Sequence, residues 1–172
     1  MPHKYKETLN CSVADALELI GEGWTILILR EAFFGSRRFE DFQKHLGIAR
    51  NILTTRLQKL VDGNVLERIP IKEGAKRHEY KLTPMGRDLY PVLIALSQWG
   101  DRWLRTESGI PVQFIERSSG EEIAPVSIRS QDGREIDARD LALKPGPGAT
   151  AETKQRLAIM AEMVESLMKK SP

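Results

Sequence analysis

The sequence contains one cysteine, Cys11, and only three histidines among its 172 residues. A single thiol cannot form a disulfide within the chain, and neither residue type is arranged with metal-ligand spacing. No run of about 18 apolar residues is present, so no membrane-spanning helix is expected. The N-terminal residues lack the apolar core of a signal peptide. We therefore expect a cytoplasmic protein without a cofactor, a metal or a membrane partner.

Enzyme motifs and a strong overall charge are missing as well. The chain has no glycine-rich phosphate-binding loop and no Ser-His-Asp pattern in a supporting context, so we expect no enzymatic activity. Net charge is only +2, but residues 35–87 hold 12 Lys and Arg against 6 Asp and Glu. This region is a candidate footprint for nucleic acid, although an ordinary solvated surface explains the charge equally well.

Hydrophobic periodicity predicts a helical chain with one β-hairpin. Apolar residues recur at helical spacing over residues 12–20, 24–34, 38–46, 47–62 and 84–104. Two alternating segments, 65–71 and 78–83, flank a polar, glycine-containing tip and predict the hairpin. Thr83 and Pro84 are suited to cap and open the helix that follows. The order of elements is that of a winged helix-turn-helix.

The character of the sequence changes after Leu104. Short alternating segments between Pro111 and Leu143 predict a small β-rich unit, and "KPGPGAT" reads as a linker before a last helix. The predicted fold is therefore mainly α with a β-hairpin wing, followed by the β-rich unit and a terminal helix. We divide the chain into a winged-helix domain over 1–106, the β unit over 107–144, the linker over 145–150 and the helix over 151–172.

The sequence has a cysteine before the first helix, a Gly-rich break before Trp24, "GSRRF" at 35–39, "RLQKL" at 56–60 and "YKLTPMGR" at 80–87. Together these motifs resemble those of the HxlR-type family of bacterial winged-helix transcriptional regulators, which are MarR-like. The resemblance covers about Cys11–Trp103. It implies a homodimer that binds pseudo-palindromic operator DNA as a repressor or an activator. A small-molecule or redox signal is a further candidate partner, whereas the operator, the direction of regulation and the identity of the signal are not implied.

The sequence departs from the family pattern at three places. Ser12 follows the cysteine where proline is common, and Gly21-Glu22-Gly23 stands where Gly-Gly-Lys is common. Ala49-Arg50 replaces the usual Ser-Pro at the start of the recognition helix, so the side-chain cap is lost. Such a loss typically costs about 1 kcal/mol.

The stretch "GIARNILTTRLQKL", residues 47–60, is the expected recognition helix. At about 100° per residue, Leu53, Leu57 and Leu60 share a buried face with Val61. The opposite face contains no acid from Gly47 to Val61 and bears amides and hydroxyls that can read base edges. A solvent-facing polar stripe is the alternative interpretation.

Basic residues around this helix are expected to contact phosphates, with the hairpin tip in the flanking minor groove. For Arg37 and Arg38, at the start of the helix predicted over 38–46, the alternative is a loop with ordinary surface charge. The full set of expected DNA contacts is Arg37, Arg38, Arg50, Asn51, Thr54, Thr55, Gln58, Lys59, Lys76 and Arg77. If this surface met no DNA, it would suit an acidic protein partner, and the module would serve protein–protein interaction.

A long apolar stripe on the helix at 84–104 is expected to form a dimer interface together with the first helix. The residues concerned are Val13, Leu17, Leu93, Leu96, Trp99 and Trp103. An intrachain core under the C-terminal unit remains the alternative.

Some HxlR-type members sense oxidants or electrophiles through the cysteine, so the resemblance makes Cys11 a candidate redox sensor. The alternative is that Cys11 is a small packed residue without a sensing role.

Some HxlR-type proteins also carry a C-terminal segment that looks like a zinc ribbon. The corresponding knuckle glycines here are Gly120 and Gly133. The ligand positions hold Glu116, Ser119, Arg129 and Asp132 instead of thiolates and imidazoles, which a structural zinc site needs. We therefore expect this unit to be free of metal.

Overall fold

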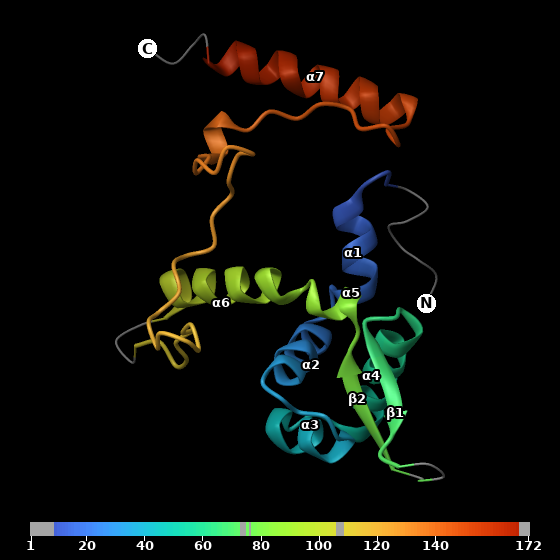
Figure 1. Cartoon of the computed structure of the whole chain (residues 1–172). Helices are drawn as coiled ribbons and strands as arrows, with labels where there is room; N and C mark the ends of the chain where they lie inside the picture. Colours follow the sequence, from blue (N-terminus) through green and yellow to red (C-terminus); the bar gives the residue numbers. More distant parts are fainter. Residues whose placement is uncertain (1–8, 73–74, 76, 106–108, 169–172) are drawn as a thin grey trace. The chain divides into compact units, whose positions relative to one another are not determined.

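The computed structural model describes residues 9–72, 75, 77–105 and 109–168 (Figure 1). The chain forms two compact units. One unit is Leu19–Val126, and the other combines the two ends of the chain, Met1–Glu18 and Ser127–Pro172. Within the described ranges, no helix is both long and apolar enough to cross a membrane.

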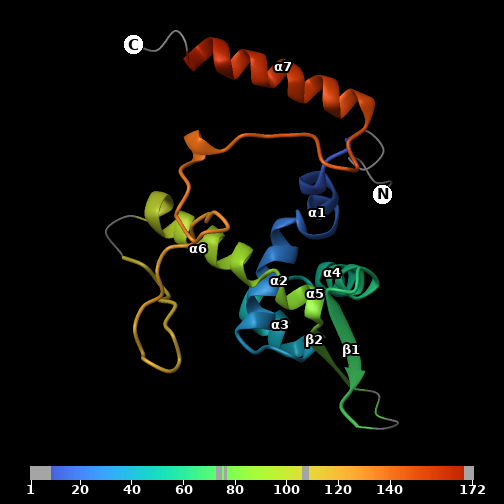
Figure 2. The same cartoon turned by 45° about the horizontal axis from the view of Figure 1, so that its top comes forward.

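The predicted winged helix-turn-helix is confirmed. Its elements, in chain order, are α1 (Ser12–Ile20), α2 (Gly23–Phe33), α3 (Phe39–Leu46), α4 (Arg50–Asp62), β1 (Leu66–Pro70), β2 (His78–Leu82), α5 (Pro84–Arg87) and α6 (Tyr90–Leu104). The two strands form an antiparallel hairpin whose register pairs Leu66 with Leu82 and Pro70 with His78. In Figures 1 and 2 the two strands of this hairpin run side by side away from the helices.

The core of this unit lies between α2, α3, α4 and the base of the hairpin. Leu53, Leu57 and Leu60 of α4 are almost completely buried, together with Ile28 and Phe42. Each such side chain contributes about 1.5–3 kcal/mol of hydrophobic stabilisation. The leucine face predicted for α4 is therefore the face that packs into the core.

A tight turn joins α3 to α4. Gly47 adopts a left-handed conformation with φ of 62°, which costs glycine little, and its N–H donates to the carbonyl of Gln43 at 3.0 Å. Ala49 occupies the cap position of α4 and makes no side-chain hydrogen bond to the helix. The prediction of an uncapped start is thus confirmed.

The helix predicted over residues 84–104 is in fact two helices. Thr83 caps α5, because its hydroxyl oxygen accepts the N–H of Gly86 at 3.0 Å. This short helix ends at Arg87, and α6 begins at Tyr90. Pro91 explains the break, since it lacks an N–H and its ring would clash with the carbonyl of residue 87 in a continuous helix.

The region between residues 111 and 143 is more irregular than expected. Where short strands were predicted, the structure has two isolated antiparallel bridges, Ile115–Glu122 in the first unit and Arg129–Glu135 in the second. Most side chains of this region are exposed. Without a face to bury, alternating residues do not assemble into a sheet.

The second unit contains the predicted terminal helix, α7 (Ala151–Met168), and the short 3-10 helix η1 (Ala138–Asp140). Asn10 ties the N-terminal segment to the start of α7. Its side-chain oxygen accepts the hydroxyl of Thr153 at 2.9 Å and the N–H of Thr150 at 3.3 Å. These bonds explain why the two ends of the chain share a unit.

Gly86 is expected to be irreplaceable at the junction of hairpin and α5. A Cβ there would overlap the carbonyl oxygen of Val65, a backbone atom held by Thr83. Gly86→Ala should lower the free energy of unfolding by about 3 kcal/mol. Gly100→Ala is the control, because its Cβ enters open space and should stabilise α6 by up to about 1 kcal/mol. Urea denaturation measures both, and equal stability of the two variants would contradict the packing described.

Candidate nucleic-acid interface

The polar face of α4 is open to solvent. Asn51, Thr54, Thr55 and Gln58 are exposed, opposite the buried leucines. None of the side chains from Gly47 to Val61 is acidic, so this surface presents only neutral polar and basic groups. It is the kind of surface that a nucleic-acid groove can approach without charge repulsion.

The hydroxyls on this face are already partly used. Thr54 donates to the carbonyl of Arg50 at 2.8 Å, and Thr55 donates to the carbonyl of Asn51 at 3.0 Å. What remains of each threonine is a methyl group and acceptor lone pairs, which suit contact with a thymine methyl group or a base amino group. The amide of Gln58 donates to Asp62 at 2.7 Å, whereas the side chain of Asn51 has no hydrogen-bond partner within the described ranges.

A basic groove of about 460 Å³ lies beside this face, between the start of α3, the start of α4 and the hairpin. Four arginines line it, namely Arg38, Arg50, Arg68 and Arg77, together with the acids Glu40 and Asp41. The guanidinium of Arg50 stacks over the ring of Phe39, 4.9 Å from its centroid. We call this feature the arginine groove.

Arg68 was not among the residues predicted for the interface. It lies on β1 opposite Tyr80, and its Nη2 is 3.3 Å from Nδ1 of His78. The sequence feature that could have identified Arg68 is the two-residue period of a strand. Residues two apart on a strand share a face, so Arg68 lies on the same face as the buried Leu66. On that face Arg68 lies beyond the edge of the core, where it lines the arginine groove.

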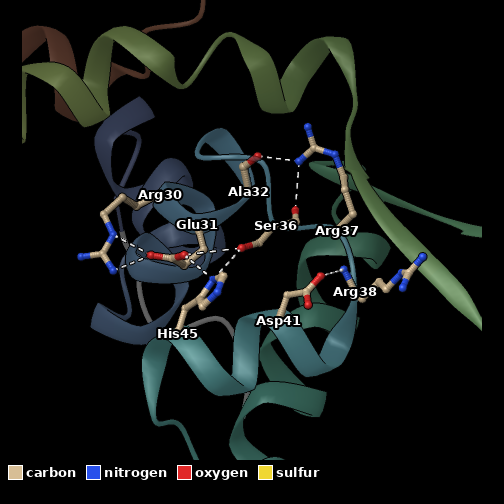
Figure 3. A network of polar contacts seen from close by, with 8 residues as sticks. All are labelled: Arg30, Glu31, Ala32, Ser36, Arg37, Arg38, Asp41 and His45. Atoms are coloured by element: carbon tan, nitrogen blue, oxygen red, sulfur yellow. Dashed lines mark hydrogen bonds and ion pairs between the residues drawn. The ribbon is translucent and has the colours of Figure 1, made fainter.

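The two arginines before α3 have different surroundings (Figure 3). Nη1 of Arg37 donates to the carbonyls of Ala32 at 2.6 Å and Ser36 at 2.9 Å, within the loop that joins α2 to α3. The main-chain carbonyl of Arg37 also accepts the N–H of Tyr80 at 2.7 Å, which fixes the hairpin to this loop. Arg38 is exposed and lines the arginine groove, and its Nε lies 4.0 Å from Oε1 of Glu79.

Lys59 also has a partner within the chain. Its Nζ lies 3.5 Å from one carboxylate oxygen of Glu22, and Arg56 is ion-paired with the other oxygen. Glu22 precedes α2 and stands at one of the positions where the chain departs from the family pattern. The acid pairs with both basic residues, and the phosphate contact expected of Lys59 stays a prediction.

The hairpin tip is described only in part. Lys76 lies outside the described residues, whereas Arg77 is exposed. The main-chain carbonyl of Arg77 accepts the N–H of Ile71 at 3.1 Å, which closes the hairpin beyond its last strand pair. Arg77 is thereby held at the rim of the arginine groove.

A polar cluster connects α2 with α3 behind this surface, and we call its members Arg30, Glu31, Ser36 and His45 the Glu31 network (Figure 3). Glu31 is only 7% exposed. One of its oxygens accepts two hydrogen bonds from Arg30, at 2.7 and 3.2 Å, and the other lies 3.2 Å from Nδ1 of His45 and 3.4 Å from the hydroxyl of Ser36. A buried carboxylate needs such partners, so the network holds the two helices in one arrangement.

The expected dimer residues fall into two groups. On α6, Leu96, Trp99 and Trp103 are exposed, with exposed fractions of 53% for Trp99 and 63% for Trp103, whereas Leu93 packs against the core of its own unit. Val13 and Leu17 of α1 are exposed as well.

Cys11 is exposed just before α1, and its carbonyl accepts the first helical N–H, that of Asp15, at 3.1 Å. It is the single thiol of the chain. No contact that the structure describes tests sensing, so the redox role of Cys11 stays a prediction.

The two turns compared with zinc knuckles satisfy their own polar groups. Gly120 and Gly133 both have a positive φ, as tight turns require. The hydroxyl of Ser119 donates to Glu116 at 2.7 Å in one turn, and Nη1 of Arg129 donates to the carbonyl of Gly133 at 3.0 Å in the other. The Ser130 hydroxyl and the Arg134 guanidinium hold the pKa of Asp132 below its usual range.

Comparison with known proteins agrees with this geometry. A family model described as HxlR-like helix-turn-helix matches residues 19–108. The uncharacterised HTH-type transcriptional regulator Rv3095 of Mycobacterium tuberculosis is 46% identical over 141 residues, which cover 82% of this chain and 89% of that protein.

Two solved structures are similar over most of the chain. The crystal structure of PA1607, assigned as a transcription factor, is 39% identical with a TM-score of 0.76 and covers 81% of this chain and 98% of its own. The structure of PA1374 from Pseudomonas aeruginosa, with the same assignment, is 40% identical with a TM-score of 0.61 and covers 85% and 99%.

Arg37 and Arg38 should differ in their effect on stability. Arg37→Ala removes the donor to two loop carbonyls and should lower the free energy of unfolding by about 1–3 kcal/mol. Arg38→Ala, the matched control one residue away, should stay within about 0.5 kcal/mol of the parent protein. Chemical denaturation followed by circular dichroism measures both values. If the order were reversed, Arg37 would not anchor the loop.

Proposed function

Because the chain belongs to the HxlR-like helix-turn-helix family of transcriptional regulators, we propose that it binds operator DNA as a homodimer and regulates transcription there. In this proposal α4 enters the major groove, and the hairpin lies on the flanking minor groove or backbone. The observation that carries the proposal is the exposed, acid-free face of α4, which is backed by buried leucines and bordered by the arginine groove.

The residues on the exposed face of α4 are assigned to base contacts. Asn51 is suited to bind adenine through both amide groups, since its side chain has no partner in the described part of the chain. Thr54 and Thr55 offer methyl groups and acceptor oxygens, while Gln58 must exchange its bond to Asp62 for a bond to a base. These four side chains would determine which operator sequence is bound.

Phosphate contacts are assigned to the arginine groove. Arg38, Arg50, Arg68 and Arg77 gather there from three different elements, so they follow the path of a backbone rather than a single helix. The stacking of Arg50 on Phe39 limits the orientations of its guanidinium before DNA arrives. Such contacts position the protein on the duplex but carry no sequence information of their own.

Dimerisation is assigned to the exposed apolar residues of α6. Leu96, Trp99 and Trp103 expose apolar surface on one helix. Apolar surface of this kind commonly marks a protein–protein interface. A two-fold dimer places two recognition helices on half-sites about one helical turn apart, which gives the specificity that one helix lacks. Val13 and Leu17 of α1 are proposed as further contacts.

Salt-dependent binding to DNA that flanks its own gene tests the proposed function. Fluorescence anisotropy should show affinity that falls steeply with salt, and Arg68→Ala combined with Arg77→Ala should flatten the slope of log affinity against log salt by about 2. Arg117→Ala, an exposed arginine outside the arginine groove, is the control and should leave the slope unchanged. Binding that is insensitive to salt would favour a protein partner and overturn the proposal.

The dimer is tested separately by sedimentation. The parent protein should sediment as a dimer at micromolar concentration, and Trp99→Asp combined with Trp103→Asp should give a folded monomer, because two charges would have to be buried. Ile128→Asp, which changes an exposed apolar residue outside α6, should remain dimeric. A monomeric parent protein would refute the assignment.

A further inference from the structure

A pocket of about 610 Å³ lies between α2, α6 and the segment Pro111–Phe114. Its volume falls within the range of about 300–1,000 Å³ that is typical of small-molecule sites. The walls are mostly aromatic and aliphatic and include Phe33 and Phe34 of α2, Tyr90 and Leu93 of α6, and Phe114. None of these residues belongs to the surface that we assign to DNA.

The walls are held in place by specific contacts. The rings of Phe33 and Tyr90 lie 5.1 Å apart and join α2 to α6 at one end of the pocket. Gln98 of α6 donates to the carbonyl of Ala124 at 3.3 Å and accepts the N–H of Val126 at 2.7 Å, which fixes the returning chain to α6. The carbonyl of Phe114 accepts the N–H of Ile123 at 2.9 Å, so the third wall is fixed to that returning chain.

The third wall lies outside the core of the family. The family model ends at residue 108, whereas this wall begins at Pro111. The pocket is therefore completed by a part of the chain that the helix-turn-helix core does not require. An added segment that encloses apolar space suggests a binding role rather than a role in folding alone.

The charges of the pocket balance. Two basic residues, Arg30 and Arg105, and two acidic residues, Glu31 and Asp101, line it. The net charge of the lining is therefore zero, so the pocket favours neither an anion nor a cation. Arg30 uses Nε and Nη2 to bind Glu31, which leaves Nη1 without an acceptor in the described part of the chain. Its guanidinium also lies 6.0 Å from the ring centroid of Phe34, at the edge of the aromatic wall.

We propose that this pocket binds an uncharged apolar molecule that contains aromatic rings and carries one acceptor oxygen, with Arg30 donating to that oxygen. The aromatic walls supply apolar contact, and Arg30 supplies the single directional bond. A second copy of the chain is the competing occupant. The pocket and the proposed dimer surface share Leu96, whereas Trp99 and Trp103 belong to the dimer surface and do not line the pocket.

Arg30 also connects the pocket to the DNA-binding helices. It binds Glu31, whose second oxygen contacts Ser36 and His45, and His45 lies in the last turn of α3. A ligand oxygen bonded to Nη1 shifts the guanidinium of Arg30 and so changes its two bonds to the buried carboxylate that holds α2 and α3 together. This second step, and only this step, rests on the proposed function.

Binding is tested without DNA by titrating the full chain with 6-propionyl-2-dimethylaminonaphthalene, an uncharged fluorescent ketone. Its emission should shift to the blue and saturate at one molecule per chain. Gly100→Leu places a side chain in the pocket and should weaken binding at least about tenfold, whereas Gly100→Ala, whose Cβ meets no atom, should stay within about twofold. Absence of saturation, or equal binding by both variants, would overturn the proposal.

Competition identifies the role of Arg30. 2-Acetylnaphthalene should displace the dye about tenfold better than 2-ethylnaphthalene, which lacks the acceptor oxygen, and better than the anion 2-naphthoate. Arg30→Met should abolish the preference for the ketone over the hydrocarbon while the dye still binds. Equal competition by all three compounds in the parent protein would refute the acceptor site.

The connection to DNA is measured by repeating the operator titration with saturating 2-acetylnaphthalene. The affinity should change by at least about fivefold in the parent protein, and the change should disappear in Gly100→Leu and in His45→Ala. An unchanged operator affinity would overturn the connection while the dye titration still stood. Failure to bind any DNA would instead overturn the proposed function and leave the pocket intact.

Discussion

Burial of the leucine face of α4 is the interaction on which the rest of the surface depends. Leu53, Leu57 and Leu60 fill the space between α2 and the base of the hairpin, and Phe42 closes the same core from α3. Since a helix has 3.6 residues per turn, burying these positions forces Asn51 and Thr55 outward. The surface proposed to bind DNA is therefore positioned by hydrophobic packing on its opposite side, not by its own contacts.

Polar contacts set the finer geometry around that core. Arg37 closes the loop between α2 and α3 and accepts the N–H of Tyr80, so helices and hairpin share one anchor. Glu31 joins the same two helices from the other side, and Glu22 draws Arg56 and Lys59 toward α2. In each case a buried or half-buried charge is satisfied within the chain. The groove gathers four further arginines, and of these Arg38 lies 4.0 Å from a carboxylate oxygen of Glu79.

Elements with a strong local signal were predictable from the sequence, and contacts between distant residues were not. The recognition helix, the turn at Gly47 and the cap at Thr83 follow from periodicity and residue type. The break before α6 was missed although Pro91 signals it, because the apolar stripe continues across it. The pairing of Glu22 with Lys59 and of Glu31 with His45 joins residues too far apart for any helical or strand period to relate them.

The most direct test of the central claim is selection of bound sequences from a random DNA pool by the parent protein and by Asn51→Ala. If α4 enters the major groove with this face, the parent protein selects a pseudo-palindrome. Asn51→Ala should then lose its preference at one base pair in each half-site, at a cost of about 1–3 kcal/mol, while the other positions are kept. A uniform loss of affinity with unchanged preference, or no selected sequence at all, would contradict the account.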